Sequence, residues 1–360
     1  MNYTTQLAVL LLLALPMPAG AQDATPPAPR REFRSSLSVI EDATIYSNLR
    51  VPVPSAFNQL LVEPSVGLRY RHRLTLSTSL AGIVGTHSET HVQGRVKEAY
   101  AGLSAGDFDF TLGRRMVRWG VGYAFTAAGV LDPPRVPTNP TDRLNLNQGR
   151  DMIKGDYVRG PHALSLAWSS AVLAPARSPL RDTTAFRYNF LVRGFDTSLI
   201  AGDDRGGDAF GALTFTRVLG QSWEIHGEAA WREQGALLAG AKCTTRSGVT
   251  FIAEFYTPPN TPYFRDSAAL PIAGRQRFFF FDVGKNRLRE LPGWKEWDVS
   301  GYLVANLNDL SYTAILDTNR RFGNRFSAYL HLEIPRGGRT SGYGAAPYST
   351  ATSAGIRFQL

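Results

Sequence analysis

The stretch that decides the fold is the last ten residues of the chain, Ala351 to Leu360, which read ATSAGIRFQL. Apolar and polar side chains alternate along it with a period of two residues, which is the period of a β-strand. A strand with this pattern has one apolar and one polar face. The apolar face carries Ala354, Ile356, Phe358 and Leu360.

Apolar residues occupy the last, third-last and fifth-last positions, at Leu360, Phe358 and Ile356. This arrangement resembles the final strand of bacterial outer-membrane β-barrels, where such residues serve as the assembly signal. The resemblance implies recognition by the barrel assembly machinery. On these residues alone, a half-buried strand at the end of a soluble β protein is the alternative.

The start of the chain favours the membrane barrel. The apolar run from Leu7 to Leu15 is too short to span a bilayer, and small residues end it in an A-x-A pattern at Ala19 to Ala21. This pattern predicts a secretory signal peptide over residues 1–21. Residues 22–32 are rich in Pro and Ala and predict an extended tether, which leaves 33–360 for the barrel.

Composition excludes several classes of protein. The chain after residue 21 has no run of about 18 apolar residues, so it is not a helical membrane protein. The mean hydropathy of −0.17 and the 34 glycines suit strands that are apolar on one side only. The net charge of +9 comes from scattered residues in an exported chain, so nucleic acid is not an expected partner.

Alternating segments recur along the whole chain and predict an all-β fold, a transmembrane antiparallel β-barrel of about 18 strands (range 16–18). The expected strands are Arg34–Tyr46, Leu60–Arg71, Leu74–Gly85, Val92–Leu103, Asp107–Val117, Asp151–Val158, Ala163–Leu173, Ala185–Val192, Phe195–Gly202, Asp208–Val218, Ser222–Arg232, Leu237–Cys243, Gly248–Tyr256, Gln276–Val283, Trp297–Ala305, Leu310–Thr318, Arg325–Ile334 and Ala351–Leu360.

The connections between these strands test the count. Such barrels have short periplasmic turns and longer outer loops, and here long and short connections alternate from one end to the other. The exception is Gly284–Glu296, which falls on the side of the short turns although it is long. Inward-pointing charges are expected at Arg69, Lys154, Asp156, Arg187 and Glu254.

The hairpin Val92–Val117 turns at Ala105-Gly106. This turn predicts that Leu103 pairs with Phe108, that Glu98 lies opposite Gly113 and diagonal to Arg115, and that both charges point inward. The pair is either a charged rung of a pore wall or an internal ion pair that fixes the register.

The connection of residues 118–150 is long and is stiffened by four prolines, and loops of this length are usually functional. Its apolar part, Tyr123 to Leu131, predicts that it folds back into the barrel. Its arginines would then form a basic constriction. Such a constriction would select for anions, because rings of Arg or Lys favour them. The alternative is that the loop packs outward on lipopolysaccharide. The predicted constriction residues are Arg115, Arg118, Arg135, Arg143, Arg150, Lys154 and Glu98.

Four motifs between Glu98 and Tyr157 carry a family resemblance: EAYAGL, DFDFTLGRRMVRWG, NPTDR and GRDMIKGDY. They resemble a pattern of the porin-like outer-membrane β-barrels of Gram-negative bacteria, the 18-strand uptake or export channels. The resemblance implies a channel for hydrophilic solutes or polysaccharides and does not indicate which substrate passes.

Two other chemistries are weighed against a channel. His87, Glu89 and His91 form H-x-E-x-H, but no further ligand is identifiable, so no metal and no cofactor are expected. No G-x-S-x-G and no recognisable Ser/His/carboxylate arrangement occurs, so no enzyme is expected.

The leading hypothesis is therefore an outer-membrane channel that passes hydrophilic, in particular anionic, solutes by passive diffusion. The alternatives are an exopolysaccharide export channel, favoured only by the long segment Gly284–Glu296 with Lys285, Arg287 and Arg289, and a non-conducting structural or adhesion barrel. Expected partners are outer-membrane lipid and lipopolysaccharide. A homo-oligomer remains open.

Overall fold

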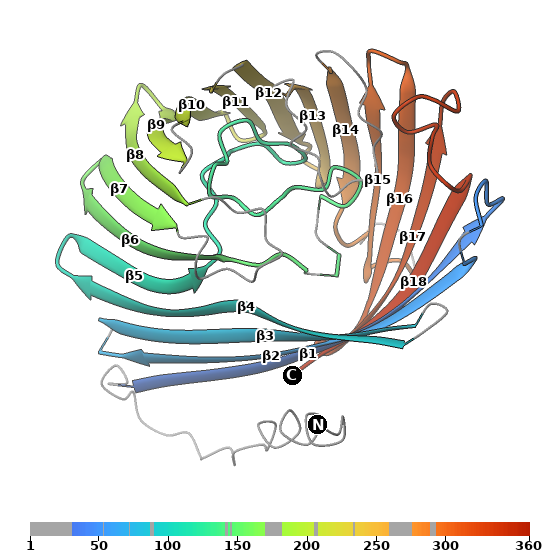
Figure 1. Ribbon diagram of the computed structural model, residues 1–360, viewed down its shortest axis with the longest axis horizontal. Coiled ribbons are helices and arrows are strands. Elements are labelled where there is room, and N and C mark those ends of the chain that lie inside the picture. The colour runs from blue at the N-terminus through green and yellow to red at the C-terminus, as the bar shows by residue number, and fades with distance from the viewer. Residues whose placement is uncertain are drawn as a thin grey trace.

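The structure, a computed structural model, forms one closed antiparallel sheet of 18 strands (Figure 1). It describes residues 31–52, 54–71, 73–86, 90–140, 143–144, 146–169, 182–204, 208–232, 235–258, 276–288 and 293–360. Among these residues, no helix is long and apolar enough to cross a membrane. The signal peptide and most of the tether expected over residues 1–32 lie outside the described residues.

The expected all-β barrel and its 18 strands are confirmed. The first strand begins three residues before the expected Arg34 and so takes in the last two residues assigned to the tether, Arg31 and Glu32. The strands are β1 (Arg31–Ser47), β2 (Ala56–Tyr70), β3 (Leu74–Thr86), β4 (Thr90–Ala105), β5 (Phe108–Arg115), β6 (Arg150–Arg159), β7 (His162–Ser169), β8 (Thr183–Val192), β9 (Phe195–Asp204), β10 (Asp208–Leu219), β11 (Trp223–Trp231), β12 (Gly235–Thr244), β13 (Val249–Thr257), β14 (Phe278–Lys285), β15 (Trp297–Asn306), β16 (Ser311–Phe322), β17 (Phe326–Arg336) and β18 (Thr350–Gln359).

The barrel closes between its first and last strands, since β1 pairs with both β2 and β18. The two backbone bonds that complete this seam join Leu37 and Leu360: each N–H donates to the other carbonyl, at 3.2 and 2.9 Å. Closure removes the sheet edges that would otherwise leave backbone groups unpaired, which is the requirement for a sheet in lipid.

The connections fall into two classes at the two ends of the barrel. One end, here called the short-turn edge, carries residues 71–73, 106–107, 160–161, 193–194, 220–222, 245–248, 286–296 and 323–325. All of these are tight turns except 286–296, as the sequence indicated. The opposite end carries the longest connections, above all residues 116–149 between β5 and β6, together with some short ones such as 307–310.

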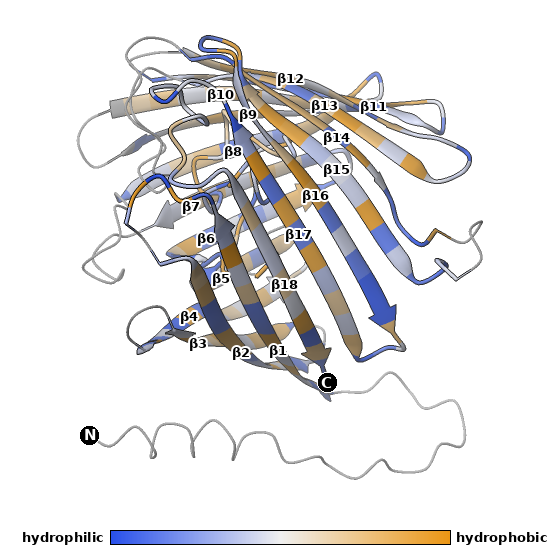
Figure 2. Ribbon diagram, turned by 90° about the vertical axis from the view of Figure 1, so that its right-hand side faces the viewer, coloured by the Kyte–Doolittle hydropathy of each residue, from blue (hydrophilic) through white to orange (hydrophobic). Residues whose placement is uncertain are grey.

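Hydrophobic and hydrophilic residues alternate along the strands, as Figure 2 shows by the banding of β16 to β18. On β11, Trp223 and Trp231 are 54% and 57% exposed on the outer surface, whereas His226 and Glu228 point inward and are buried. Outward apolar and inward polar residues are what a bilayer and a wet interior require.

The expected register of the hairpin β4–β5 is wrong by two residues. Leu103 pairs with Phe110, and Tyr100, not Glu98, lies opposite Gly113. The difference comes from the turn, which is two residues shorter than expected because Ala105 itself pairs with Phe108. A shift of two residues keeps every side chain on the same face, so alternation alone cannot reveal it.

The last strand yields a prediction about assembly. Phe358 faces outward and packs on Phe326 of β17 with ring centroids 4.7 Å apart, whereas the neighbouring Gln359 points inward. We expect Phe358→Ala to lower the assembled, heat-modifiable fraction severalfold and Gln359→Ala to leave it near the wild-type value. Outer-membrane fractionation with gel mobility measures both. Equal losses at the two positions would contradict the assignment of the assembly signal to the apolar face.

Candidate functional site

The connection of residues 116–149 runs inside the ring of strands, where Figure 1 draws it in teal and green. Two residues before the end of β5, Gly113 has a φ of +117°, which is accessible to glycine. A Cβ at this position would lie 2.3 Å from the carbonyl oxygen of Ala99 on the neighbouring strand. The end of β5 before the loop can therefore pack this closely on β4 only because residue 113 has no side chain.

Glu228 of β11 is the first of two buried carboxylates that hold the loop. Its Oε1 accepts backbone N–H bonds from Val121 and Gly122 at 2.5 and 2.8 Å. Its Oε2 accepts those of Ala127 and Ala128 at 2.5 and 2.7 Å, and the Thr126 hydroxyl at 2.9 Å. One carboxylate thus satisfies five donors of a loop that has no strand partner.

Glu254 of β13 is the second such carboxylate. It accepts the backbone N–H groups of Tyr123, Ala124 and Phe125, the last two at 2.9 and 3.3 Å. His226 lies beside it, with Nε2 2.9 Å from Glu254 Oε1. Because hydrogen bonds to a charged group are the strong ones, these two glutamates fix the course of residues 121–128.

Apolar packing supports the same course. Phe125 stacks on Tyr256, with centroids 4.9 Å apart, in a cluster on the inner wall of β12 to β16. Trp119, Ala128 and Leu131 pack against the inner wall of β7 to β10. Leu144 packs against Ile40, Leu61 and Ala81 of β1 to β3. The loop is therefore seated on three sides of the barrel.

Arg135, one of the predicted arginines, stabilises the loop itself. Arg135 donates to the carbonyl oxygens of Gly120 and Tyr123 and lies 3.3 Å from Asp132. Asp132 also accepts the N–H of Trp119 at 2.6 Å. Burial raises the pKa of the Asp132 carboxyl, and these hydrogen bonds and Arg135 act in the opposite direction.

Arg143 makes the third link between loop and wall. Its guanidinium lies 3.6 Å from Asp42 and 5.3 Å from the ring centre of Tyr329, which itself donates to Asp42 at 2.7 Å. Arg357 of β18 donates to the carbonyl oxygen of Arg143. Arg135 and Arg143 are thus held in structural contacts, and they do not meet the other predicted basic residues.

Three of the other predicted residues, but not Arg150, come together below the loop, toward the short-turn edge. Arg115, Arg118, Lys154 and Arg187 line one cavity of about 370 Å³, which we call the basic cavity. Arg118 is exposed and Arg187 is fixed by a 3.0 Å bond to Ser198. Asp109 and Asp156 also line the cavity, and Asp156 pairs with Lys154. Cations are therefore in excess on this side.

A second cavity of about 750 Å³ lies along the opposite wall and includes more carboxylates. Asp282 has one buried oxygen, Oδ1, without a hydrogen-bond partner among the described residues. Asp317 accepts the Tyr302 hydroxyl at 2.8 Å and contacts His331 at 2.6 Å. Serines, together with Arg143, Lys242 and Arg357, complete a polar lining.

The pair expected between Glu98 and Arg115 does not form. Glu98 accepts the backbone N–H of Met116 at 2.8 Å, which fixes the start of the loop. Arg115 stacks over Tyr100 at 4.8 Å and donates to Thr111 at 2.9 Å. The ladder of β4 with β5 ends at Ala99 and Arg114, and beyond it the two side chains take these separate partners. Arg150, at the start of β6, is half-buried and engaged in other interactions.

Sequence reasoning did not find the roles of Glu228 and Asp132. An inward carboxylate on a strand is visible from alternation, as Glu254 was, but its partners are backbone groups of a distant loop. His87 and Glu89 of the H-x-E-x-H motif lie outside the described residues. No group of three His, Cys, Asp or Glu side chains suited to a metal occurs in the described part of the chain.

A closed 18-stranded antiparallel barrel with a polar interior and an inward-folded loop defines the porin class of folds. No protein-family model matches the chain, and no curated protein does. Solved structures do: Pseudomonas aeruginosa OccK11 (OpdR) is similar with a TM-score of 0.62 and 10% identity, over 91% of this chain and 96% of that one.

Two further solved structures support the same fold. Pseudomonas aeruginosa OccK5 (OpdH) gives a TM-score of 0.61 with 7% identity, over 91% of this chain and 98% of that one. An engineered porin of Rhodopseudomonas blastica gives 0.50 with 10% identity, over 91% of this chain and 100% of that one. The expected porin-like barrel is therefore confirmed as a fold.

Proposed function

We propose that this protein is a channel of the bacterial outer membrane through which hydrophilic solutes, and small anions in particular, diffuse passively. The observation that carries the proposal is the basic cavity, in which Arg115, Arg118, Lys154 and Arg187 gather under the inward loop. A barrel of 18 strands has room for an aqueous path, and inward cations favour anions. Neither an enzymatic reaction nor a cofactor is part of this proposal.

The proposal includes the route to the membrane. A cleaved signal peptide over residues 1–21 would export the chain, and the terminal strand would be read by the barrel assembly machinery. Outer-membrane lipid and lipopolysaccharide would surround the barrel, with the short-turn edge in the periplasm. Association into homo-oligomers is compatible with this route and is not required by it.

Polysaccharide export is the second candidate. It is favoured by one feature, the long connection 286–296 on the short-turn edge, which lies where a periplasmic partner would dock. Arg287 is described there, Lys285 is the last residue of β14, and Arg289 lies outside the described residues. The inward loop argues against it, because a polymer needs a wider path than a small anion.

Liposome swelling tests the proposal. We expect liposomes containing the purified protein to swell in an isotonic small sugar, and faster in a sugar acid of the same size, because the basic cavity concentrates anions. A barrel that folds, as judged by heat-modifiable gel mobility, but gives no swelling in either solute would exclude a diffusion channel. Equal rates for the two solutes would exclude the preference for anions.

A further inference from the structure

Arginine side chains on the outer surface of the short-turn edge are stacked on aromatic rings. Arg320 of β16 lies between two of them, 5.6 Å from the ring centre of Trp297 and 4.8 Å from that of Phe322. Its outward direction follows from the register, because Arg320 pairs with Ala328 and Ala328 pairs with Ile356, which is exposed on the outer face.

The same arrangement recurs elsewhere on this edge. Arg217 of β10 lies 4.6 Å from the ring centre of Phe195, and Phe195 packs on the outward Phe215. Arg31 and Arg71 lie 5.6 and 5.1 Å from the ring centre of Tyr70. These three places lie on separate strand pairs, β15–β16, β9–β10 and β1–β2, so the arrangement is repeated on this edge.

These guanidinium groups have no carboxylate partner among the described residues. The neighbouring residue gives the contrast: Arg321 points inward and pairs with Asp298. A cation stacked on a ring at the membrane surface keeps the N–H groups along its free edge available for an oxyanion. The outward arginines are thus held in place but not neutralised.

We propose that Arg31 with Arg71, Arg217 and Arg320 are binding sites for the phosphate groups of anionic phospholipids in the leaflet that meets the short-turn edge. A planar guanidinium binds a phosphate through two parallel N–H bonds. The aromatic rings lie at the level of the headgroups, where amphipathic rings are stable. The apolar wall beside them accepts the acyl chains.

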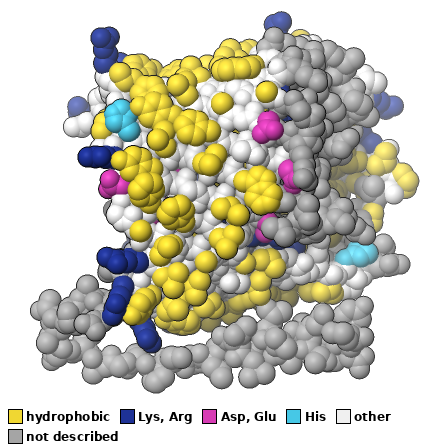
Figure 3. All heavy atoms as spheres, turned by 60° about the vertical axis from the view of Figure 1, so that its left-hand side comes forward, with side chains coloured by type: hydrophobic (Ala, Val, Ile, Leu, Met, Phe, Trp, Pro, Cys, Tyr) yellow, Lys and Arg dark blue, Asp and Glu magenta, His cyan; other side chains and the backbone are white. Residues whose placement is uncertain are grey.

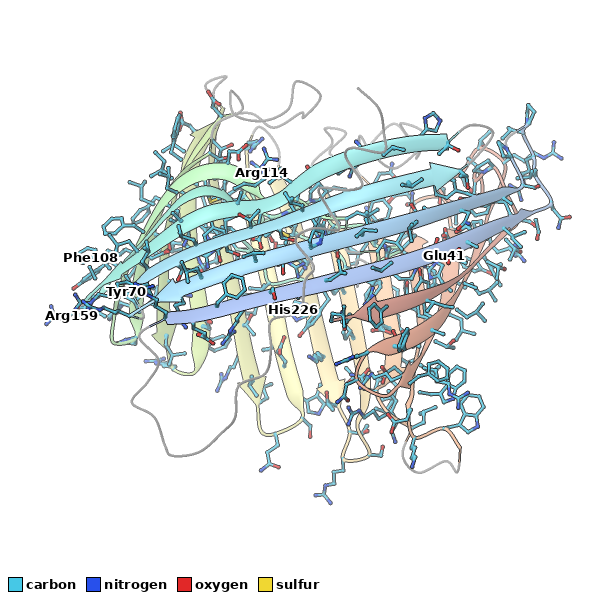
Figure 4. The ribbon with its side chains drawn as sticks, turned by 90° about the horizontal axis from the view of Figure 1, so that it is seen from below. Glu41, Tyr70, Phe108, Arg114, Arg159 and His226 are labelled. Atoms are coloured by element: carbon cyan, nitrogen blue, oxygen red, sulfur yellow. The ribbon has the colours of Figure 1, made fainter. Side chains whose placement is uncertain are left out.

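The wider surface supports the choice of an anionic lipid. Figure 3 shows basic side chains along one edge of a wall that is largely hydrophobic. Figure 4 labels Tyr70, Phe108 and Arg159 together at one end of the barrel, the end where their strands meet the short turns. Further arginines in these turns, such as Arg246, are exposed and raise the positive potential of the edge.

Fluorescence quenching by brominated lipids tests the proposal on the full protein in bilayers, because Trp297 and Trp223 lie at or near the proposed sites. The probes are brominated phosphatidylglycerol and brominated phosphatidylcholine, and the readout is their relative binding constant. An arginine near a membrane surface contributes about 1 kcal/mol, so Arg320→Gln should lower the local preference for phosphatidylglycerol by about fivefold. Arg217→Gln should act similarly.

Arg246→Gln is the matched control, since it removes the same charge from the same edge at a position without an aromatic ring. It should lower the preference clearly less than Arg320→Gln does, because no ring holds its guanidinium at the level of the headgroups. An equal loss in Arg246→Gln would mean that net charge alone acts, and no loss in Arg320→Gln would exclude the site; either result overturns the proposal. The assay does not involve conduction, so its failure and that of the channel are distinguishable.

Discussion

Glu254→Ala is expected to detach the tip of the loop from the inner wall and to raise the single-channel conductance. The substitution removes the acceptor for the N–H groups of Tyr123, Ala124 and Phe125 and for His226. Hydrogen bonds to a charged group each contribute about 1.5–3 kcal/mol, and the freed donors would be left unpaired in the interior. Conductance should become larger and noisier.

The wall itself should survive this change, because the ladder of β13 with β12 and β14 is made by backbone groups. Heat-modifiable mobility like that of the wild type would show that the barrel is intact. Glu254→Gln keeps the size of the side chain and one carbonyl acceptor, so its conductance should lie between those of the wild type and Glu254→Ala. Unchanged conductance and noise in Glu254→Ala would contradict the role of this carboxylate as an anchor.

Neutralising the basic cavity should reverse or abolish the preference for anions. Arg118 is exposed in the cavity, and Lys154 is the partner of Asp156, so Arg118→Gln with Lys154→Gln removes two cations and leaves one carboxylate uncompensated. Reversal potentials in a salt gradient measure the permeability ratio. The shift should be larger at low salt, because charges are screened within roughly 10 Å at 0.1 M.

The matched control for this pair is Arg135→Gln. Arg135 carries the same charge but does not line the basic cavity, because its guanidinium is held against loop carbonyls and Asp132. Its effect on the permeability ratio should be small. A double variant that keeps the wild-type reversal potential would move the selective region out of the basic cavity.

The strand pattern could be predicted from the sequence because the bilayer imposes one rule on every strand, apolar outward and polar inward. Trp223 and Glu228 follow that rule, and the alternation of long and short connections fixed the direction of each strand. The register of β4–β5 could not be predicted, since a turn of two residues and a turn of four leave every side chain on the same face and change only its partners. The contact of Glu98 with the backbone of Met116 is likewise not visible from alternation.

The interior could be predicted only in part. The loop's apolar stretch indicated that it turns inward, but its arginines look alike in the sequence. Arg118 is exposed in a cavity, whereas Arg135 forms an ion pair with Asp132 and Arg143 forms one with Asp42. The carboxylate that an arginine meets can lie more than a hundred positions away in the sequence, as Asp42 does from Arg143. Alternation describes only neighbouring residues and cannot predict such a contact.

Planar-bilayer recording of the wild-type protein tests the central claim most directly. Refolded barrel, confirmed by heat-modifiable mobility, should give stepwise openings with current that rises in proportion to voltage, since diffusion through a fixed aqueous path needs no energy input. In a salt gradient, the reversal potential should have the sign of an anion-preferring pore. A folded barrel that inserts and remains silent would contradict the channel, and a cation-preferring pore would contradict the role of the basic cavity.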